Sequence, residues 1–303
     1  MKKKWNIYSI FAYSLVIFLW ASSFPGIRVG LESFRPEQLA LLRLLIGSVV
    51  LLLIACTTRM RLPDLKDVPA ILLLGFLGFT VYHTALSIGE KTVSSGVASL
   101  LVSTTPIFSA FLGVFFLRER FGIAKWTGSI ISFVGVIIIS VGTGEGDHST
   151  TGILLILIAA FSESLYFVFQ TRYLKKYGFL AFVTYTIWGG TLLMLFFVQG
   201  LEREIIHASL ESIISVGYLG VFPTVIPYFA LAYITSQVGT AEATTSLYLI
   251  PTFTFFIAWV WLGEIPTILS IGGGVLTLLG VLVTHINENR FKEKLTRDRK
   301  LSV

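Results

Sequence analysis

Long runs of apolar residues, separated by short polar segments, make up almost the whole chain. Ten runs of about 20 residues carry one charge or none, and this length suffices for a helix to cross the hydrocarbon core of a bilayer. Lipid offers no partner to the edge amides of an open sheet, so helices are expected. The ten predicted spans are Ile7–Ile27, Leu39–Thr58, Val68–Gly89, Thr92–Leu117, Trp126–Gly144, Thr151–Thr171, Tyr177–Leu201, Ser212–Thr235, Gly239–Gly263 and Ile265–Thr284.

The composition agrees with an integral membrane protein. Of the 303 residues, 54% are hydrophobic and only 13% are charged, whereas about 25% of the residues in soluble proteins are charged. The apolar content also excludes a disordered chain. A single cysteine, Cys56, excludes an intrachain disulfide and a cysteine-rich metal site, and we expect neither a metal nor a cofactor.

The distribution of Lys and Arg predicts the orientation in the membrane. With the N-terminus inside and ten spans, 18 of the 23 cationic residues fall in inner segments and 4 in outer ones, and Arg43 lies within a span. Cytoplasmic segments favour Lys and Arg, so both termini are predicted to be cytoplasmic. The net charge of +6 is then explained by anionic lipid headgroups, and the predicted partner is the bilayer, not nucleic acid.

The second half of the chain repeats the first half at an offset of about 145 residues. We therefore expect a first repeat at 1–145, a second at 146–286 and a basic cytoplasmic tail at 287–303. Five spans per copy is an odd number, so the second copy enters the membrane from the opposite side. Such inverted repeats are typical of secondary transporters, whose substrate site lies between the halves. The matching pairs include Ala98 with Ala243, Pro106 with Pro251, Glu119 with Glu264, Gly128 with Gly273, and Gly135 with Gly280.

Several short motifs carry a resemblance to a known family. They are Trp20-Ala21-Ser22-Ser23-Phe24, Leu41-Leu42-Arg43-Leu44-Leu45, Gly96-Val97-Ala98-Ser99-Leu100-Leu101, Leu117-Arg118-Glu119-Arg120 and Gly263-Glu264. In this order the chain resembles the EamA-like group of the drug/metabolite transporter superfamily. The resemblance implies ten helices, both termini inside, and movement of small metabolites, often amino acids. The second copy departs from the family at Phe161–Ser164, where a tryptophan-containing stretch is common.

Glu163 is the candidate with the clearest chemistry. It lies about twelve residues into its span, near the middle of the membrane, where a carboxylate costs roughly 2.5–3.5 kcal/mol. The functional interpretation is proton coupling or binding of a substrate amine. The alternative is a hydrogen-bonded glutamate that bridges helices.

Arg43 and His83 also lie within spans. The fork of Arg43 could bind a substrate carboxylate, or it could cap helix carbonyls, and the structural role is favoured because the resembled family carries Arg here across differing substrates. His83 is either a neutral histidine between helices or a donor to the cavity. Glu90 and Glu242 lie near span ends and are expected to be solvated.

Further polar and aromatic side chains within spans are candidates for the wall of a substrate cavity. Such mixed surfaces suit small amphipathic solutes, although Trp and Tyr also favour the headgroup region. These candidates are Trp20, Tyr82, Tyr166, Gln170, Tyr228 and Tyr248.

Prolines and small residues recur at matching places in the two copies. Pro106 and Pro251 are repeat partners and are expected to kink their helices symmetrically. Gly128, Ser132 and Gly135 form a small-residue face, as do the repeat partners Gly273, Thr277 and Gly280. Such faces let helices approach closely, either within one chain or in a homodimer.

The motifs of several other classes are absent. The sequence contains neither the GxxxxGK[ST] nor the HExxH pattern, so neither ATP hydrolysis nor a zinc protease is expected. The sequence predicts a non-enzymatic, multi-pass transporter of the cell membrane that moves a small metabolite by alternating access. The resemblance to the EamA-like group implies efflux of amino acids or related solutes as the favoured activity. A membrane-embedded enzyme and a channel are the alternatives.

Overall fold

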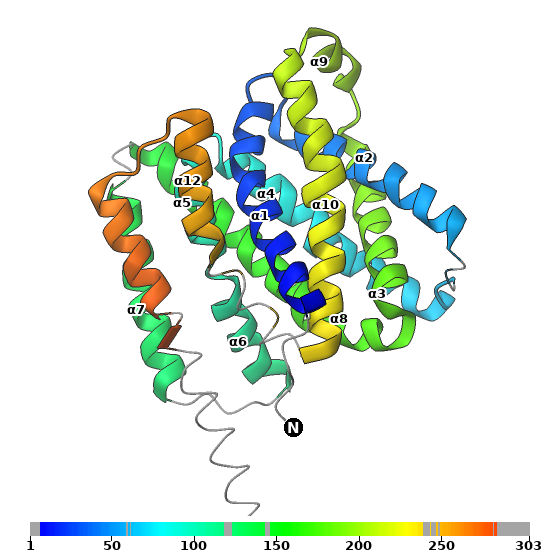
Figure 1. Ribbon diagram of the computed structural model, residues 1–303, viewed down its shortest axis with the longest axis horizontal. Coiled ribbons are helices and arrows are strands. Elements are labelled where there is room, and N and C mark those ends of the chain that lie inside the picture. Colours follow the sequence, from blue (N-terminus) through cyan, green and yellow to red (C-terminus); the bar gives the residue numbers. More distant parts are fainter. Residues whose placement is uncertain are drawn as a thin grey trace, which may run out of the picture.

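The computed structural model describes residues 7–58, 60, 62–117, 123–142, 146–238, 243, 247, 249–280 and 282–283. Within these ranges the chain is almost entirely helical and has no strand, which confirms the all-α prediction. The elements form one bundle (Figure 1). They are α1 (Ile7–Gly30), α2 (Pro36–Thr57), η1 (Leu65–Asp67), α3 (Val68–Gly75), η2 (Phe76–Val81), α4 (Tyr82–Gly89), α5 (Ser95–Val102), α6 (Thr105–Leu117), α7 (Ile123–Gly142), α8 (Gly146–Met194), η3 (Leu195–Phe197), α9 (Leu201–His207), α10 (Leu210–Val238), α12 (Ile250–Leu262) and a last apolar helix, Ile268–Gly280.

The longest element, α8, consists of two arms joined at a sharp bend. Gly178 has φ 77° and ψ 162°, a conformation that favours glycine. The arms then run back along each other, and the rings of Tyr173 and Phe182 stack with centroids 5.7 Å apart. The sequence prediction ended this span at Thr171. The helix itself continues past this residue, because Lys and Arg are good helix formers and extend it as far as the glycine. The bend lies at the end of the bundle opposite α9 (Figure 1).

The predicted span Thr92–Leu117 is divided into α5 and α6. The backbone turns at Ser103 and Thr104, so α6 begins again at Thr105. Pro106 is the second residue of α6. N–H groups in the first turn of a helix have no acceptor within the helix, so the missing N–H group of proline costs no hydrogen bond there. Pro251 occupies the same position in α12.

Two small-residue faces pack on each other within the chain. A Cβ atom added at Gly135 of α7 would lie 2.6 Å from the carbonyl oxygen of Gly273 in the last helix. Close by, the Ser132 hydroxyl donates to the carbonyl oxygen of Thr277 at 2.9 Å. The glycines are therefore required for the close approach of these two helices, and both faces are covered inside one molecule.

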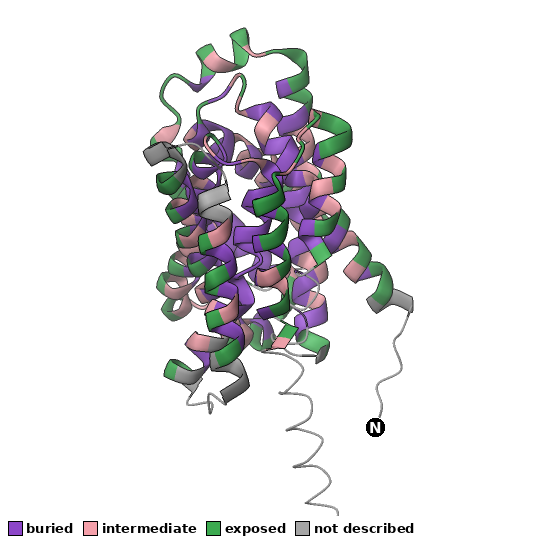
Figure 2. Ribbon diagram, turned by 90° about the vertical axis from the view of Figure 1, so that its left-hand side faces the viewer, coloured by how far each residue is buried: buried purple, intermediate pink, exposed green. Residues whose placement is uncertain are grey.

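The outer surface of the bundle is apolar. Figure 2 shows buried residues in the middle and exposed ones around them, and many of the exposed side chains are large hydrophobic ones, including Leu53, Phe115, Phe196 and Trp259. In the described residues, six helices are long and apolar enough to cross a membrane, and three shorter apolar helices accompany them. An apolar surface of this extent requires lipid around it, as in a multi-pass membrane protein.

Glu90 departs from the sequence prediction. It was expected to be solvated, but its exposed fraction is 0%. The backbone around it is covered from two sides. The guanidinium of Arg28 donates to the Glu90 carbonyl oxygen, and α8 approaches so closely that a Cβ at Gly89 would lie 2.8 Å from the Gly152 carbonyl oxygen. Glu242 lies outside the described residues.

Candidate functional site

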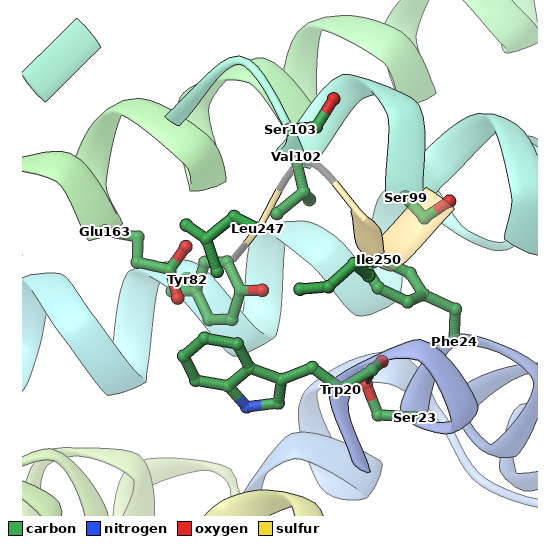
Figure 3. A pocket seen from close by; sticks show the side chains of 10 residues that line it. All are labelled: Trp20, Ser23, Phe24, Tyr82, Ser99, Val102, Ser103, Glu163, Leu247 and Ile250. Carbon is green, nitrogen blue, oxygen red and sulfur yellow. Dashed lines mark hydrogen bonds between the residues drawn. The ribbon is translucent and has the colours of Figure 1, made fainter. Parts of the chain in front are cut away.

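A cavity lies in the middle of the bundle, between helices from both halves of the chain (Figure 3). The centre of a water molecule can occupy about 20 Å³ of it, which is room for one or two waters and too little for a metabolite. The lining of the cavity comes from α1, α4, α5 and α8 and from the region that begins α12, and comprises Trp20, Ser23, Phe24, Tyr82, Ser99, Val102, Ser103, Glu163, Leu247 and Ile250.

Two serines fix the position of Glu163 on α8. The Ser162 hydroxyl donates to the Leu77 carbonyl oxygen in η2 at 2.7 Å. The Ser164 hydroxyl shares its proton between the Ala160 carbonyl oxygen of its own helix, at 2.7 Å, and the carbonyl oxygen of Thr105 at the start of α6, at 2.8 Å. These bonds hold α8 against two neighbouring elements, so the carboxyl group between the serines is directed at the cavity (Figure 3).

The carboxyl group of Glu163 is weakly satisfied. Only 2% of the residue is exposed, and its oxygens lie 3.5 Å from the hydroxyls of Thr105 and Tyr228, the outer limit of a hydrogen bond. Thr105 has a single hydroxyl proton, and its oxygen is closer to the Val102 carbonyl oxygen, at 2.7 Å. In the part of the chain that the structure describes, Glu163 forms no ion pair. A buried carboxylate in this setting needs a proton or a cationic ligand.

Two prolines in α10 explain the position of Trp20. Pro227 has no N–H group, so the carbonyl oxygen of Pro223 loses its helical partner. The indole Nε1 of Trp20 donates to this oxygen at 3.2 Å and replaces the missing bond. The indole is thereby held at the cavity wall, with its ring centroid 5.2 Å from that of Tyr228.

The same mechanism places Arg43 one turn away. Pro223 leaves the Leu219 carbonyl oxygen without its helical donor, and the Thr224 hydroxyl donates to it at 2.8 Å. The Nε of Arg43 in turn donates to the Thr224 hydroxyl oxygen at 3.1 Å. Arg43 is 2% exposed and forms no ion pair among the described residues, either with Glu163 or with another carboxylate. It lies outside the cavity lining.

Arg43 and Glu163 are nevertheless linked through α10. Their contacts on this helix, Thr224 and Tyr228, are four residues apart and so lie on one face. A buried arginine and a buried glutamate, neither of which forms an ion pair among the described residues, therefore approach the same helix on successive turns.

The remaining candidates divide into wall, support and unplaced residues. Tyr82 lines the cavity with Trp20 and Glu163. Tyr166 lies behind the wall, where its ring packs against Gly78 so closely that a Cβ there would be 2.6 Å from the ring. His83, Gln170 and Tyr228 are buried but do not line the cavity. Tyr248 lies outside the described residues.

Sequence reasoning missed three serines of the cavity wall. The hydroxyls of Ser23, Ser99 and Ser103 donate to carbonyl oxygens of their own helices at 2.6–2.7 Å. Their protons are occupied, so what each offers to the cavity is an oxygen lone pair. Together with Glu163 they make a wall rich in acceptors, which suits a ligand with N–H groups. The run Ser99 to Thr105 before a proline was the signal in the sequence.

The described residues contain no group of three or more His, Cys, Asp or Glu side chains that could hold a metal ion. The lining of the cavity offers hydroxyl groups, one indole and one carboxyl group. Such a wall can bind and release a small polar molecule.

Comparisons with known proteins agree over nearly the full length. The profile of the EamA-like transporter family matches residues 7–141 and again residues 150–286. The uncharacterized transporter YdfC of Bacillus subtilis is 60% identical over 293 residues, covering 97% of this chain and 95% of that protein. A probable terminal-alkyne amino-acid exporter of Streptantibioticus cattleyicolor is 34% identical over 277 residues, covering 91% and 93%. A solved crystal structure with 17% identity superposes with a TM-score of 0.62 over 92% of this chain and 97% of its own, which shows a shared fold.

Proposed function

The chain belongs to the EamA-like transporter family, and on this premise we propose that it exports amino acids or closely related metabolites across the cell membrane by alternating access. The family and the names of the relatives indicate a transporter, not an enzyme. The observation that carries the substrate class is Glu163 on the wall of a central cavity, a buried carboxyl group that forms no ion pair among the residues the structure describes.

The proposed topology has ten spans in two inverted repeats, residues 1–145 and 146–286. The double match of the family profile supports two copies. The bend at Gly178 supports counting α8 as two spans, because its 49 residues far exceed the roughly 20 that cross a bilayer. The distribution of Lys and Arg supports cytoplasmic termini and puts the end of the bundle that carries α9 outside.

The proposed ligand is a zwitterion. The acceptor-rich wall around Glu163 would take an ammonium group, and Arg43 would take a carboxylate once the helices move apart. The relative named as a probable amino-acid exporter supports this class and the outward direction. The cavity has no room for an amino acid, so transport requires the halves to separate.

The proposed partners are the metabolite and the lipid bilayer. A homodimer would need a surface other than the small-residue faces of α7 and the last helix, since these cover each other within the chain.

Counterflow tests the proposal. Purified protein in liposomes loaded with unlabelled L-amino acids should take up a radiolabelled L-amino acid mixture, and Glu163→Gln should lower this uptake at least tenfold. The loss of one charged hydrogen bond to the ligand, about 1.5–3 kcal/mol, sets the scale. Glu211→Gln, at an exposed position of α10, is the matched control and should leave uptake unchanged. Undiminished uptake by Glu163→Gln would remove this residue from the site. A chemically altered solute would indicate an enzyme, and flux without counterflow would indicate a channel.

A further inference from the structure

Three polar side chains along α4 are buried without hydrogen-bond partners. His83, Ser87 and Glu90 have exposed fractions of 1%, 0% and 0%. Both ring nitrogens of His83, the hydroxyl of Ser87 and both carboxyl oxygens of Glu90 have no partner in the part of the chain that the structure describes. Buried polar atoms are nearly always paired, so three such residues on one short helix require an explanation.

Their spacing puts them in one row. Positions 83, 87 and 90 are four and three residues apart, and side chains at these intervals share a face of a helix. At about 1.5 Å per residue the row extends over roughly 10 Å. That is too long for direct hydrogen bonds between the three groups, and ordered waters are the usual partners of buried polar atoms at such distances.

The row joins one end of the bundle to the cavity. Glu90 follows the last residue of α4, where Arg28 contacts its carbonyl oxygen. At the other end, the His83 ring lies 5.0 Å from the ring of Tyr82 and 6.4 Å from that of Tyr228, measured between centroids. The Tyr228 hydroxyl donates to Glu163, so the row leads to the carboxyl group of the cavity.

We infer that α4 carries a proton path from the α9 end of the bundle to Glu163, formed by Glu90, Ser87 and His83 with intervening waters. This path rests on the proposed function and deepens it, because a proton delivered to Glu163 would displace a bound ammonium group. Glu90 takes a proton on a carboxylate oxygen and passes it through water to the Ser87 hydroxyl, which releases its own proton onward. His83 accepts a proton at one ring nitrogen and releases the proton that was bound to its other ring nitrogen. One proton enters and one leaves at each step.

The chemistry of the row favours protons over metal cations. Arg28 and Arg43 act on Glu90 electrostatically and oppose any cation, but a proton passes by hopping between hydrogen-bonded groups, whereas a sodium ion needs several oxygen ligands at once. The titratable and charged groups that face the row are Tyr82 on α4, Arg28 on α1, Arg43 on α2, Glu163 and Tyr166 on α8, Tyr228 on α10, and Glu264 after α12.

The corresponding row in the second half is interrupted. At the offset of 145, His83, Ser87 and Glu90 match Tyr228, Ala232 and Thr235 of α10. The Thr235 hydroxyl is also buried without a partner in the described residues, but Ala232 offers no polar atom to continue the row. The path is therefore complete on one side of the cavity alone, as expected if protons enter from outside and drive export.

The first test needs no substrate. Exchange of deuterium for hydrogen at the ring carbon C2 of histidine requires water and a proton at the ring, and mass spectrometry follows it for each histidine. His83 should exchange despite its burial, and Ser87→Leu, which fills the row, should slow this exchange at least tenfold. Exposed His207 on α9 is the internal reference, and Thr84→Val, on another face of α4, is the matched control. No exchange at His83, or the same rate in Ser87→Leu, would overturn the path.

The second test measures coupling. In inverted membrane vesicles, a lumen one pH unit more acidic than the medium should raise accumulation of the radiolabelled L-amino acid mixture up to tenfold. Glu90→Gln should abolish this stimulation and keep counterflow within about twofold of wild type. Stimulation that survives in Glu90→Gln would overturn the path. An absence of counterflow in the wild type would instead overturn the proposed function, and the exchange at His83 would still decide the path.

Discussion

The two ends of the bundle are both fastened by contacts between segments far apart in sequence, but with different chemistry. At the α9 end, Arg35 and Glu204 form a pair: the Arg35 Nε lies 2.6 Å from Oε1 of Glu204, and the Arg35 backbone N–H donates to Oε2 at 3.0 Å. We call this the α9-end pair. A single carboxylate thus meets two donors from a single residue, and the guanidinium also donates to the Gln199 carbonyl oxygen.

At the other end, next to the bend in α8, one cation is shared by two carboxylates. The Nζ of Lys176 lies 2.6 Å from Oδ2 of Asp64 and also contacts Asp67. The Tyr177 hydroxyl donates to Asp67 at 2.5 Å and accepts from the Asp64 backbone N–H at 3.1 Å. We call these four residues the Gly178-end network.

The difference predicts which end opens more readily. The side chain of Arg35 is 53% exposed and that of Lys176 is 34% exposed. An exposed ion pair contributes about 0–1 kcal/mol, and networks contribute more than isolated pairs. In the proposed repeat, Arg35 and Lys176 each precede the second span of their copy and bind the segment after the second span of the other copy. The α9-end pair is thus the weaker counterpart of the Gly178-end network, and we expect outward opening to cost less.

The largest effect should come from removing the shared cation. Lys176→Ala leaves Asp64 and Asp67 facing each other, so the Gly178 end should open. With Cys56→Ser and a reporter cysteine at Ser103 on the cavity wall, labelling by an impermeant thiol reagent from this end should rise about fivefold, because a cation shared by two carboxylates contributes more than an isolated exposed pair. The exposed neighbour Lys175→Ala is the control. Unchanged labelling in Lys176→Ala would mean that the network does not hold this end closed.

Glu204→Gln should have a smaller effect with the opposite sidedness. It removes the charge of the α9-end pair but keeps a side chain of the same shape, so labelling of the Ser103→Cys reporter from the α9 side should rise about threefold. Glu202→Gln, at an exposed position two residues earlier, should have no effect. A rise at the Gly178 end instead would contradict the assignment of this pair to one end.

The sequence predicted the helices and several residues of the central cavity, but it did not predict the hydrogen bonds between distant segments. Runs of apolar residues located the helices because lipid imposes their length, and Trp20, Tyr82 and Glu163 do line the cavity. Arg43 and Trp20 were expected near a site, but their hydrogen-bond partners were not predicted. Trp20 donates to the Pro223 carbonyl oxygen and Arg43 to the Thr224 hydroxyl, and both contacts exist because prolines about 200 residues away in sequence leave carbonyl oxygens of α10 without helical donors. No local pattern reports such a pairing.

The errors share a physical cause. The sequence prediction left Glu90 in solvent because it ends a span, whereas close packing at Gly89 and Gly152 buries it. The sequence analysis separated two apolar tracts at the polar residues 172–176, whereas the helix continues through these residues and the backbone turns at Gly178. The burial of a residue at the end of a span thus depends on packing against distant segments, and the position of a turn depends on backbone conformation. A hydropathy pattern contains neither kind of information.

Tyr177→Phe sharpens the comparison within the Gly178-end network. It removes both hydrogen bonds of the hydroxyl, the one donated to Asp67 and the one accepted from the Asp64 backbone N–H, and leaves the cation in place. Labelling from this end should therefore rise about twofold to threefold. In a Lys176→Ala background the same change should add less, because the two side chains share Asp67. Fully additive effects would show that Tyr177 and Lys176 act independently.

The smallest effect should come from salt, which needs no mutation. Raising NaCl from about 0.15 M to about 1 M shortens the Debye length from about 8 Å to about 3 Å. The α9-end pair has the more exposed cation, so reporter labelling from that side should rise up to about twofold, and labelling from the Gly178 end should rise less. Glu204→Gln should reduce the salt response at the α9 side, because it removes the shortest ion pair of Arg35 and leaves only the longer one to Glu37, at 3.9 Å. A larger salt response at the Gly178 end would reverse the order of the two ends and make inward opening the easier step.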